Sequence, residues 1–252
     1  MAVEINLFIC YNFDKRRYKL KKGDINLINI LFDCPNIDDF YDNLKDFFDE
    51  KTTVCVIAFS YYDDYVYDAT SWEKVYGKGL GNCYFETVDS FKPFGVKEEN
   101  ITFVNYFTDS KESAKKKIKA ADVLYFTGGL PDRMMDIIKD FELEEDIMSH
   151  EGIVMGYSAG AVIQLSEYHL YPDGDYTDFG YYKGLPMLSD FYLEVHYRGL
   201  KVQDESIKKC LGERGKTVYV TSDHGGGIVV QNGNISIIGK VDIYESEEHL
   251  SK

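Results

Sequence analysis

The chain has 252 residues, of which 44% are hydrophobic and 15% aromatic, so it can bury a sizeable core and is not an intrinsically disordered protein. Its formal net charge of −15 argues against nucleic acid or an anionic membrane as a partner. Five widely separated cysteines without C-x-x-C spacing predict neither a disulfide framework nor a zinc site. With no signal-like or membrane-spanning segment in the pattern, we expect a cytoplasmic protein.

The first two-thirds of the sequence alternates apolar strand patterns with helical ones. Strands are predicted at residues 3–10, 54–59, 101–107, 122–126 and 153–155, with a loop at 11–23. Helices are predicted at residues 36–50, from about 71, and at 110–120, 131–141 and 161–168. This alternation predicts a mostly parallel central sheet covered by helices on both faces.

The last third has a different pattern. Residues 171–184 read as a loop, and strands are predicted at 191–196, 217–220, 227–230, 235–238 and 241–244. Asn232 and Gly233 lie between two of these strands and predict an antiparallel hairpin. Since no repeat, low-complexity segment or linker interrupts the chain, we predict a single α/β hydrolase-like domain over residues 1–252, built as a three-layer sandwich with a C-terminal hairpin.

A G-x-S-x-G motif follows the apolar run at residues 153–155. It reads Gly156-Tyr157-Ser158-Ala159-Gly160 and precedes a segment of good helix formers. A nucleophile elbow has this context, because the turn between strand and helix exposes the serine hydroxyl near free backbone N–H groups. The sequence therefore favours Ser158 as a nucleophile over a purely structural glycine-rich turn.

A serine hydroxyl needs a base, and His196 is preferred because it ends the predicted strand 191–196, at the edge where sheet strands present their carboxyl ends. Glu194 lies two positions earlier on the same strand face and is a candidate neighbour. The second candidate histidine, His224, follows Asp223 and precedes three glycines, in a turn expected near the base. The other histidines, at positions 150, 169 and 249, are expected to be solvated.

Together these features resemble the family of peptidase E (aspartyl dipeptidase) and cyanophycinase, which are serine hydrolases with a class I glutamine-amidotransferase-like fold. The likeness lies in YFTGGL at residues 125–130, GYSAGA at 156–161, the segment from GLP at 184–186 to HYR at 196–198, and DHGGGIVV at 223–230. The resemblance implies Ser158 as nucleophile and His196 as base, with the backbone N–H groups of Gly129 and Ala159 as the oxyanion hole.

The family's usual Glu or Asp aligns with His224, so Asp223 stands one residue out of register. A one-residue bulge would bring Asp223 into place as the third catalytic member, and Glu194 is the alternative orienting acid. Arg198 and Arg133 are the cations available to bind an acidic substrate group.

The predicted function is a serine exopeptidase-like hydrolase, of dipeptidase or isopeptidase type, that cleaves a small peptide through an acyl-enzyme. The alternative is a catalytically degenerate family member that binds a small ligand or protein partner. A third reading is an α/β-hydrolase esterase using Ser158, Asp173 or Asp175, and His224. No cofactor or metal is predicted, and the sequence leaves a homodimer open.

Overall fold

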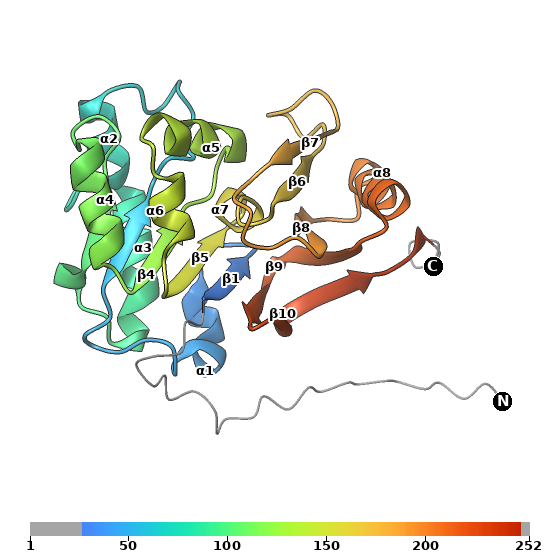
Figure 1. Ribbon diagram of the computed structural model, residues 1–252, viewed down its shortest axis with the longest axis horizontal. Coiled ribbons are helices and arrows are strands. Elements are labelled where there is room, and N and C mark those ends of the chain that lie inside the picture. Colours follow the sequence, from blue (N-terminus) through green and yellow to red (C-terminus); the bar gives the residue numbers. More distant parts are fainter. Residues whose placement is uncertain (1–26, 248–252) are drawn as a thin grey trace.

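The computed structural model of the protein describes residues 27–247, apart from the side chains of Asp223 and His224. The strand predicted at residues 3–10, the loop predicted at 11–23 and His249 therefore lie outside the described residues. Within the described range, strands from the first and last parts of the chain join in one central sheet (Figure 1).

Among the described residues this sheet has eight strands in the order β10-β9-β1-β5-β4-β2-β3, with β8 also paired to β9. The strands β1, β5, β4, β2 and β3 are parallel to one another. Their bounds are β1 Ile28–Phe32, β2 Val54–Ile57, β3 Ile101–Val104, β4 Val123–Phe126, β5 Ile153–Tyr157, β8 Phe191–Tyr197, β9 Thr217–Gln231 and β10 Asn234–Tyr244. The predicted mostly parallel sheet is confirmed.

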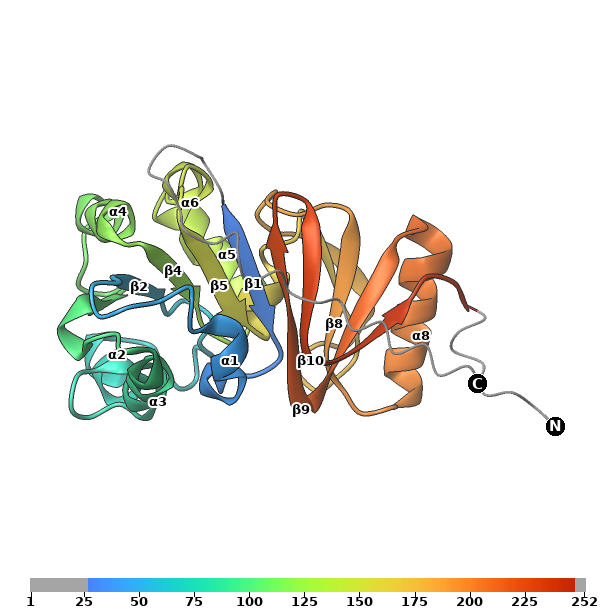
Figure 2. The same ribbon diagram turned by 90° about the horizontal axis from the view of Figure 1, so that it is seen from below.

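Helices lie on both faces of this sheet, with α2 and α3 on one side and α4 and α6 on the other (Figure 2). The α-helices are α1 Tyr41–Leu44, α2 Ala69–Tyr76, α3 Asn82–Phe91, α4 Lys111–Ala120, α5 Pro131–Asp140, α6 Glu144–Met148, α7 Ala159–Val162 and α8 Lys201–Lys209. Short 3₁₀ turns occupy Ile37–Phe40, Lys92–Phe94 and Glu98–Asn100, and a π-helical turn occupies Cys210–Arg214. Over the described range, no helix combines the length and apolarity needed to cross a membrane.

The helix predicted at residues 36–50 is shorter than expected. A 3₁₀ turn leads into α1, which ends at Leu44. Asp49 Oδ1 accepts hydrogen bonds from the backbone N–H groups of Lys51 and Thr52, at 2.8 and 3.0 Å. Such local side-chain bonds compete with helical backbone hydrogen bonds. The apolar residues after Leu44 therefore keep the helical spacing in the sequence without forming a helix.

The segment after the G-x-S-x-G motif also differs from the prediction. Helix α7 ends at Val162, and the expected helix at 161–168 gives way to strand β6, Glu167–Leu170. Strand β7, Gly180–Lys183, lies inside the segment predicted as a loop and pairs antiparallel with β6. Buried Tyr168 stacks on Tyr182 across this pair, with ring centroids 5.8 Å apart, and such aromatic pairs stabilise a ribbon.

The C-terminal hairpin is present as β9 and β10, joined at Asn232 and Gly233. Each of its strands is continuous where two short strands were predicted. Gly239 pairs with Gly226, whereas Val241 pairs with Thr221, so residues 222–225 form a bulge in β9. This bulge is wider than the one-residue bulge predicted there, and Gly225 accommodates it with φ of 82°.

Strand β9 brings the ends of two other strands together. Residues 218–220 of β9 pair with β10 on one edge and with β8, in parallel, on the other. Residues 227–231 pair with β10 and, antiparallel, with β1. Strands β8 and β1 therefore run toward each other along the same edge of β9, and their carboxyl ends meet at the bulge. The residues that follow those ends form the candidate site.

Candidate active site

Ser158 occupies a sharp turn between β5 and α7, with φ of 52° and ψ of −117°. A Cβ atom on Gly156 would lie 2.4 Å from the carbonyl oxygen of Gly160, and one on Gly160 would lie 2.2 Å from that of Phe126. Both glycines are therefore required sterically, which explains the G-x-S-x-G spacing. The Ser158 N–H donates to the carbonyl oxygen of Phe32 at 2.9 Å, tying the turn to β1.

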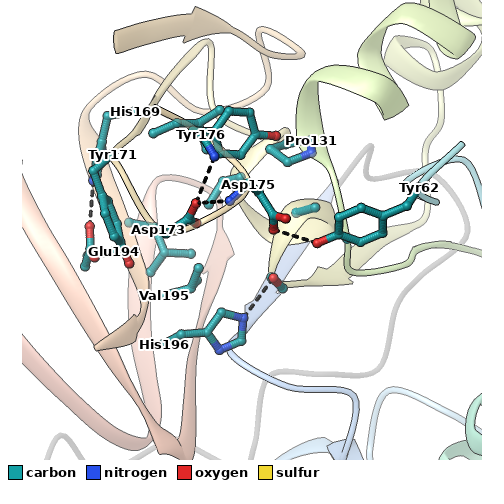
Figure 3. Close-up of a pocket in the computed structure, with 16 residues that line it drawn as sticks. Tyr62, Pro131, His169, Tyr171, Asp173, Asp175, Tyr176, Glu194, Val195 and His196 are labelled. Atoms are coloured by element: carbon teal, nitrogen blue, oxygen red, sulfur yellow. Dashed lines mark hydrogen bonds and ion pairs between the residues drawn. The ribbon is translucent and has the colours of Figure 1, made fainter. Parts of the chain in front are cut away.

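His196 lies within hydrogen-bond distance of Ser158. Its Nε2 atom is 2.8 Å from Ser158 Oγ (Figure 3). The backbone of His196 has φ of 56°, a left-handed conformation near the end of β8 that histidine adopts only at a cost. Its side chain is 42% exposed, so the ring is open to a ligand.

A carboxylate that the sequence analysis missed, Asp33, holds His196 from the other side. Asp33 Oδ1 accepts hydrogen bonds from the His196 backbone N–H at 2.6 Å and from Thr221 Oγ1 at 2.8 Å. Asp33 Oδ2 is 3.4 Å from His196 Nδ1, and the Asp33 side chain is 1% exposed. Asp33 directly follows β1, so the end-to-end meeting of β1 and β8 creates this contact.

Glu194 serves a different histidine from the one predicted. Glu194 Oε2 lies 2.7 Å from His169 Nε2, and its Oε1 lies 3.4 Å from Gln203 Nε2. Glu194 therefore does not orient His196, which corrects that alternative. His169, expected in solvent, is 5% exposed. His150 is half-buried, with Nε2 3.3 Å from the Asp122 carbonyl oxygen.

The His169–Glu194 pair is charged and closed. Burial alone would lower the pKa of His169, but the neighbouring Cys210 thiol and Glu194 carboxylate outweigh it and raise this pKa to about 10. Both side chains are nearly fully buried, at 2% and 1% exposure. The imidazole of His169 is therefore protonated at neutral pH and fixed by its carboxylate, although both residues border the same cavity as Ser158.

Gln203, at the start of α8, connects this pair to His196. Its Nε2 atom donates to the His196 carbonyl oxygen at 3.0 Å and to the Tyr171 hydroxyl at 2.9 Å. Its Oε1 atom accepts from the backbone N–H groups of Arg198 and Leu200, at 2.9 and 3.4 Å. Gln203 is 2% exposed. It thus holds the backbone around His196 in its left-handed conformation.

The two predicted oxyanion residues, Gly129 and Ala159, border the cavity beside Ser158. Gly129 has φ of 134°, and a Cβ atom there would lie 2.0 Å from the carbonyl oxygen of Ser60. Only glycine therefore fits this close approach. Helix α7 spans four residues, so any anion stabilisation here depends on individual N–H groups more than on a helix dipole.

The cavity has a volume of about 310 Å³. Tyrosines and carboxylates make up much of its wall, and its lining is Tyr62, Gly129, Pro131, Ser158, Ala159, Val162, His169, Leu170, Tyr171, Asp173, Asp175, Tyr176, Leu193, Glu194, Val195 and His196. In the view of Figure 3, Tyr62 and Glu194 lie on opposite sides, with Asp173 and Asp175 between them. The size suits a small peptide fragment.

The two predicted substrate-binding arginines do not border this cavity. Arg133 pairs with Asp63 at 2.8 Å and lies over the ring of Tyr61. Arg198 is exposed in the turn after β8. The backbone of Asp223 lies in the β9 bulge near both strand ends, but its side chain and that of His224 are not among those described. Their predicted roles stay predictions.

The fold and the Ser158–His196 contact together define the class of protein. The fold is a class I glutamine-amidotransferase-like α/β sandwich, with a serine and a histidine paired where the strands end. The family model of peptidase family S51 matches residues 82–238, which is more than half of the chain. The chain therefore belongs to peptidase family S51, and the resemblance to peptidase E is confirmed.

Solved structures support the same fold. A putative peptidase E protein from Listeria monocytogenes EGD-e superposes with a TM-score of 0.57 at 17% identity, covering 83% of this chain and 98% of that one. A peptidase from an acI-B1 Actinobacterium gives a TM-score of 0.59 at 13% identity, covering 87% and 91%. At these identities the likeness concerns the fold alone. A comparison with curated proteins gives no significant match.

Proposed function

We propose that this chain is a serine exopeptidase-like hydrolase, of dipeptidase or isopeptidase type, that cleaves a small peptide through an acyl-enzyme. One observation carries the proposal: the 2.8 Å contact between Ser158 Oγ and His196 Nε2, at the border of a cavity. Membership of a peptidase family supports the reaction class. The strained serine turn supports the role of Ser158, because such backbone strain is concentrated at functional sites.

In this mechanism His196 Nε2 removes the proton from Ser158 Oγ as the oxygen attacks the substrate carbonyl carbon. The tetrahedral intermediate collapses when the carbon–nitrogen bond breaks, and His196 gives its proton to the departing amine. A water molecule then attacks the ester carbon, transferring a proton to His196. Release of the carboxylic acid returns that proton to Ser158 Oγ, so the enzyme ends unchanged.

Asp33 takes the role of the orienting acid that was predicted for Asp223. A buried carboxylate beside His196 Nδ1 selects the tautomer with its proton on that atom and stabilises the imidazolium that forms during the reaction. The separation of 3.4 Å is longer than a hydrogen bond. Catalytic contacts of this kind are often long without substrate and shorten in the complex. Asp33 is already held by the backbone of His196 and by Thr221, so a small ring rotation suffices.

The backbone N–H groups of Gly129 and Ala159 are the proposed oxyanion donors. Both residues border the cavity beside Ser158, whereas the N–H of Ser158 itself is bonded to Phe32. Donors fixed in position before the reaction stabilise the developing negative charge without reorganisation.

The alternative of a binding-only family member depended on the displaced carboxylate at position 223. Asp33 supplies a buried carboxylate within 3.4 Å of the imidazole, which favours hydrolysis. The esterase arrangement with His224 is also disfavoured, because Ser158 is bonded to His196 and Asp175 to Tyr62.

The test is a pre-steady-state experiment with p-nitrophenyl acetate, followed by intact-mass and peptide mapping. The proposal predicts a stoichiometric burst and an acetyl group on Ser158. The Ser158→Ala variant provides the matched control and gives no burst. A folded wild-type protein that hydrolyses neither this ester nor any of a panel of dipeptides and isopeptides contradicts the proposal.

A further inference from the structure

We propose that the acyl side of the substrate carries a positive charge, which Asp173 and Asp175 recognise in the cavity. This inference rests on the proposed function, because it concerns what the Ser158 site accepts. The chemical class is an organic cation, either the α-ammonium of an N-terminal residue or a lysine or arginine side chain. It differs from the acidic side chain expected for an aspartyl dipeptidase.

The first support is the placement of the two carboxylates. Both come from the loop between β6 and β7, and both border the same cavity as Ser158 and His196. In the view of Figure 3, Asp175 and Asp173 lie above the His196 ring, among the residues that line the cavity. A cationic group within a few bonds of the reacting carbonyl would reach them there.

The second support is that other contacts hold these carboxylates in position. Asp175 Oδ2 accepts from the Tyr62 hydroxyl at 2.6 Å, and both residues line the cavity. Asp173 Oδ1 accepts from the backbone N–H groups of Asp175 and Tyr176, at 3.0 and 3.1 Å. In these contacts each carboxylate uses one oxygen, so the other oxygen can accept from a ligand ammonium or guanidinium. Pre-organised acceptors bind a cation without paying the ordering entropy at that moment.

The third support is the balance of charge in the cavity. Within residues 27–247 no lysine or arginine borders it. Arg133, one of the two predicted cations, is paired with Asp63, and the positive charge of His169 is matched by Glu194. Asp173 and Asp175 therefore leave the cavity negative. A carboxylate on the acyl side would be repelled, and such repulsion is a source of specificity.

The fourth support is the aromatic wall. Tyr62, Tyr171 and Tyr176 all border the cavity. Their hydroxyl groups are bonded to Asp175, Gln203 and Asp132 respectively, so the rings are held in place. Tyrosine faces attract ammonium and guanidinium groups through their quadrupole, and a wall of tyrosines with carboxylates therefore suits an organic cation.

The experiment measures kcat/KM for wild type, Asp175→Asn, Asp173→Asn and the double variant. Asparagine keeps the acceptor oxygen that holds the loop and removes the charge. Asp178→Asn is the matched control, because Asp178 is exposed in the same loop, accepts from Thr177 and does not border the cavity. The substrates are dipeptides and isopeptides with lysine, arginine, leucine or aspartate on the acyl side, each with a free and with an acetylated amino terminus.

We expect substrates that carry a cation to lose up to about fivefold in kcat/KM for each carboxylate neutralised, as for an exposed ion pair, while acetylated leucine substrates and the Asp178→Asn enzyme change little. Loss confined to free amino termini assigns the cation to the α-ammonium, and loss that follows lysine and arginine assigns it to the side chain. The inference is overturned if the variants affect charged and uncharged substrates alike, if they affect neither, or if acidic substrates are preferred.

Labelling of Ser158 by a fluorophosphonate separates a failure of the cation inference from a failure of the proposed hydrolase function. An enzyme that labels at Ser158 but shows no charge dependence, or cleaves none of the panel, contradicts the cation inference and leaves the reactive serine standing. An enzyme that neither labels nor cleaves contradicts the proposed function itself.

Discussion

Strand β8 contributes one member to each of two histidine–carboxylate pairs that lie side by side and behave differently. His196 near its end faces Asp33, with 3.4 Å between Nδ1 and Oδ2 and with 42% of the imidazole exposed. Glu194, two positions earlier, binds His169 at 2.7 Å with both side chains almost fully buried. The same two functional groups thus form an open pair and a closed pair.

The difference teaches what makes a histidine available for proton transfer. His169 has a pKa raised to about 10, so it holds its proton at neutral pH and cannot act as a base. His196 presents one ring nitrogen to Asp33 and the other to Ser158. A single carboxylate on one side and a hydroxyl at a cavity on the other is the arrangement that general-base catalysis needs.

Removing the imidazole of the open pair has the largest predicted effect. His196→Ala should lower kcat by about 10⁴-fold or more, because Ser158 loses its base. The free energy of unfolding should change little, since the ring is partly exposed. Steady-state hydrolysis and urea unfolding check the two halves. Retention of most of the activity contradicts the role of His196.

Removing the charge of Asp33 comes next. Asp33→Asn keeps the acceptor atom for the His196 N–H and for Thr221, but it should lower kcat by about 10²- to 10⁴-fold through loss of the imidazolium's partner. The comparison enzyme is Asp223→Asn. If Asp223→Asn causes the larger loss, the orienting acid lies in the β9 bulge as first predicted and Asp33 is structural.

A substitution in the closed pair, His169 and Glu194, should change the free energy of unfolding more than it changes turnover. Glu194→Gln leaves His169 buried without its counter-charge and should lower the free energy of unfolding by about 3 kcal/mol. Activity of the folded fraction should fall by less than about tenfold. Asp190→Asn, at an exposed aspartate just before β8, is the control and should stay within about 0.5 kcal/mol of wild type. A catalytic loss as large as that of Asp33→Asn would erase the distinction between the two pairs.

Gln203 links the pairs, so its replacement should disturb His196 indirectly. Gln203→Leu removes the bond to the His196 carbonyl oxygen and should lower kcat about tenfold with little change in KM. A purely structural role would lower stability without changing the kcat of the folded enzyme. Gln203→Glu retains the acceptor for Arg198 and Leu200 and loses the donor to His196, Tyr171 and Glu194, so it separates the donor contacts from the acceptor contacts.

The last prediction concerns the pH dependence of stability. The folded pKa of His169 is raised from 6.5 to about 10, so its contribution is fully present below pH 6.5 and is lost as the pH rises toward 10. Wild type should therefore lose stability between pH 7 and pH 10 more steeply than Glu194→Gln. Urea unfolding at four pH values in this range measures both slopes. Equal slopes would mean that His169 is not held in its charged form.

The open pair also marks the limit of sequence reasoning. Ser158 and His196 were found because each follows a local pattern that a strand and a turn impose on neighbouring residues. The parallel sheet was predictable for the same reason, since its strands β2, β4 and β5 are continuous apolar runs. Local sequence patterns were therefore enough to predict the parallel sheet, the nucleophile Ser158 and the base His196.

Asp33 was missed because its strand was missed. Within β1 the polar residue Asn29 interrupts the apolar run. Its side chain is buried, and its amide donates a hydrogen bond to Gln164 Oε1 at 3.0 Å. That partner lies 135 residues away, so the local pattern gives no sign of it. The pairing of β1 and β8 along one edge of β9 is likewise non-local. His169 was misplaced for a related reason, because its burial depends on Glu194 in a distant strand.

The most direct test of the central claim is the rate at which a fluorophosphonate modifies Ser158 in wild type, His196→Ala and Asp33→Asn, with the adduct mapped by mass spectrometry. We predict rapid labelling at Ser158 in wild type, slowing by about 10²-fold or more in both variants, because the hydroxyl is reactive only with its base correctly held. Absence of labelling in folded wild type, or equal rates in all three proteins, would contradict the account.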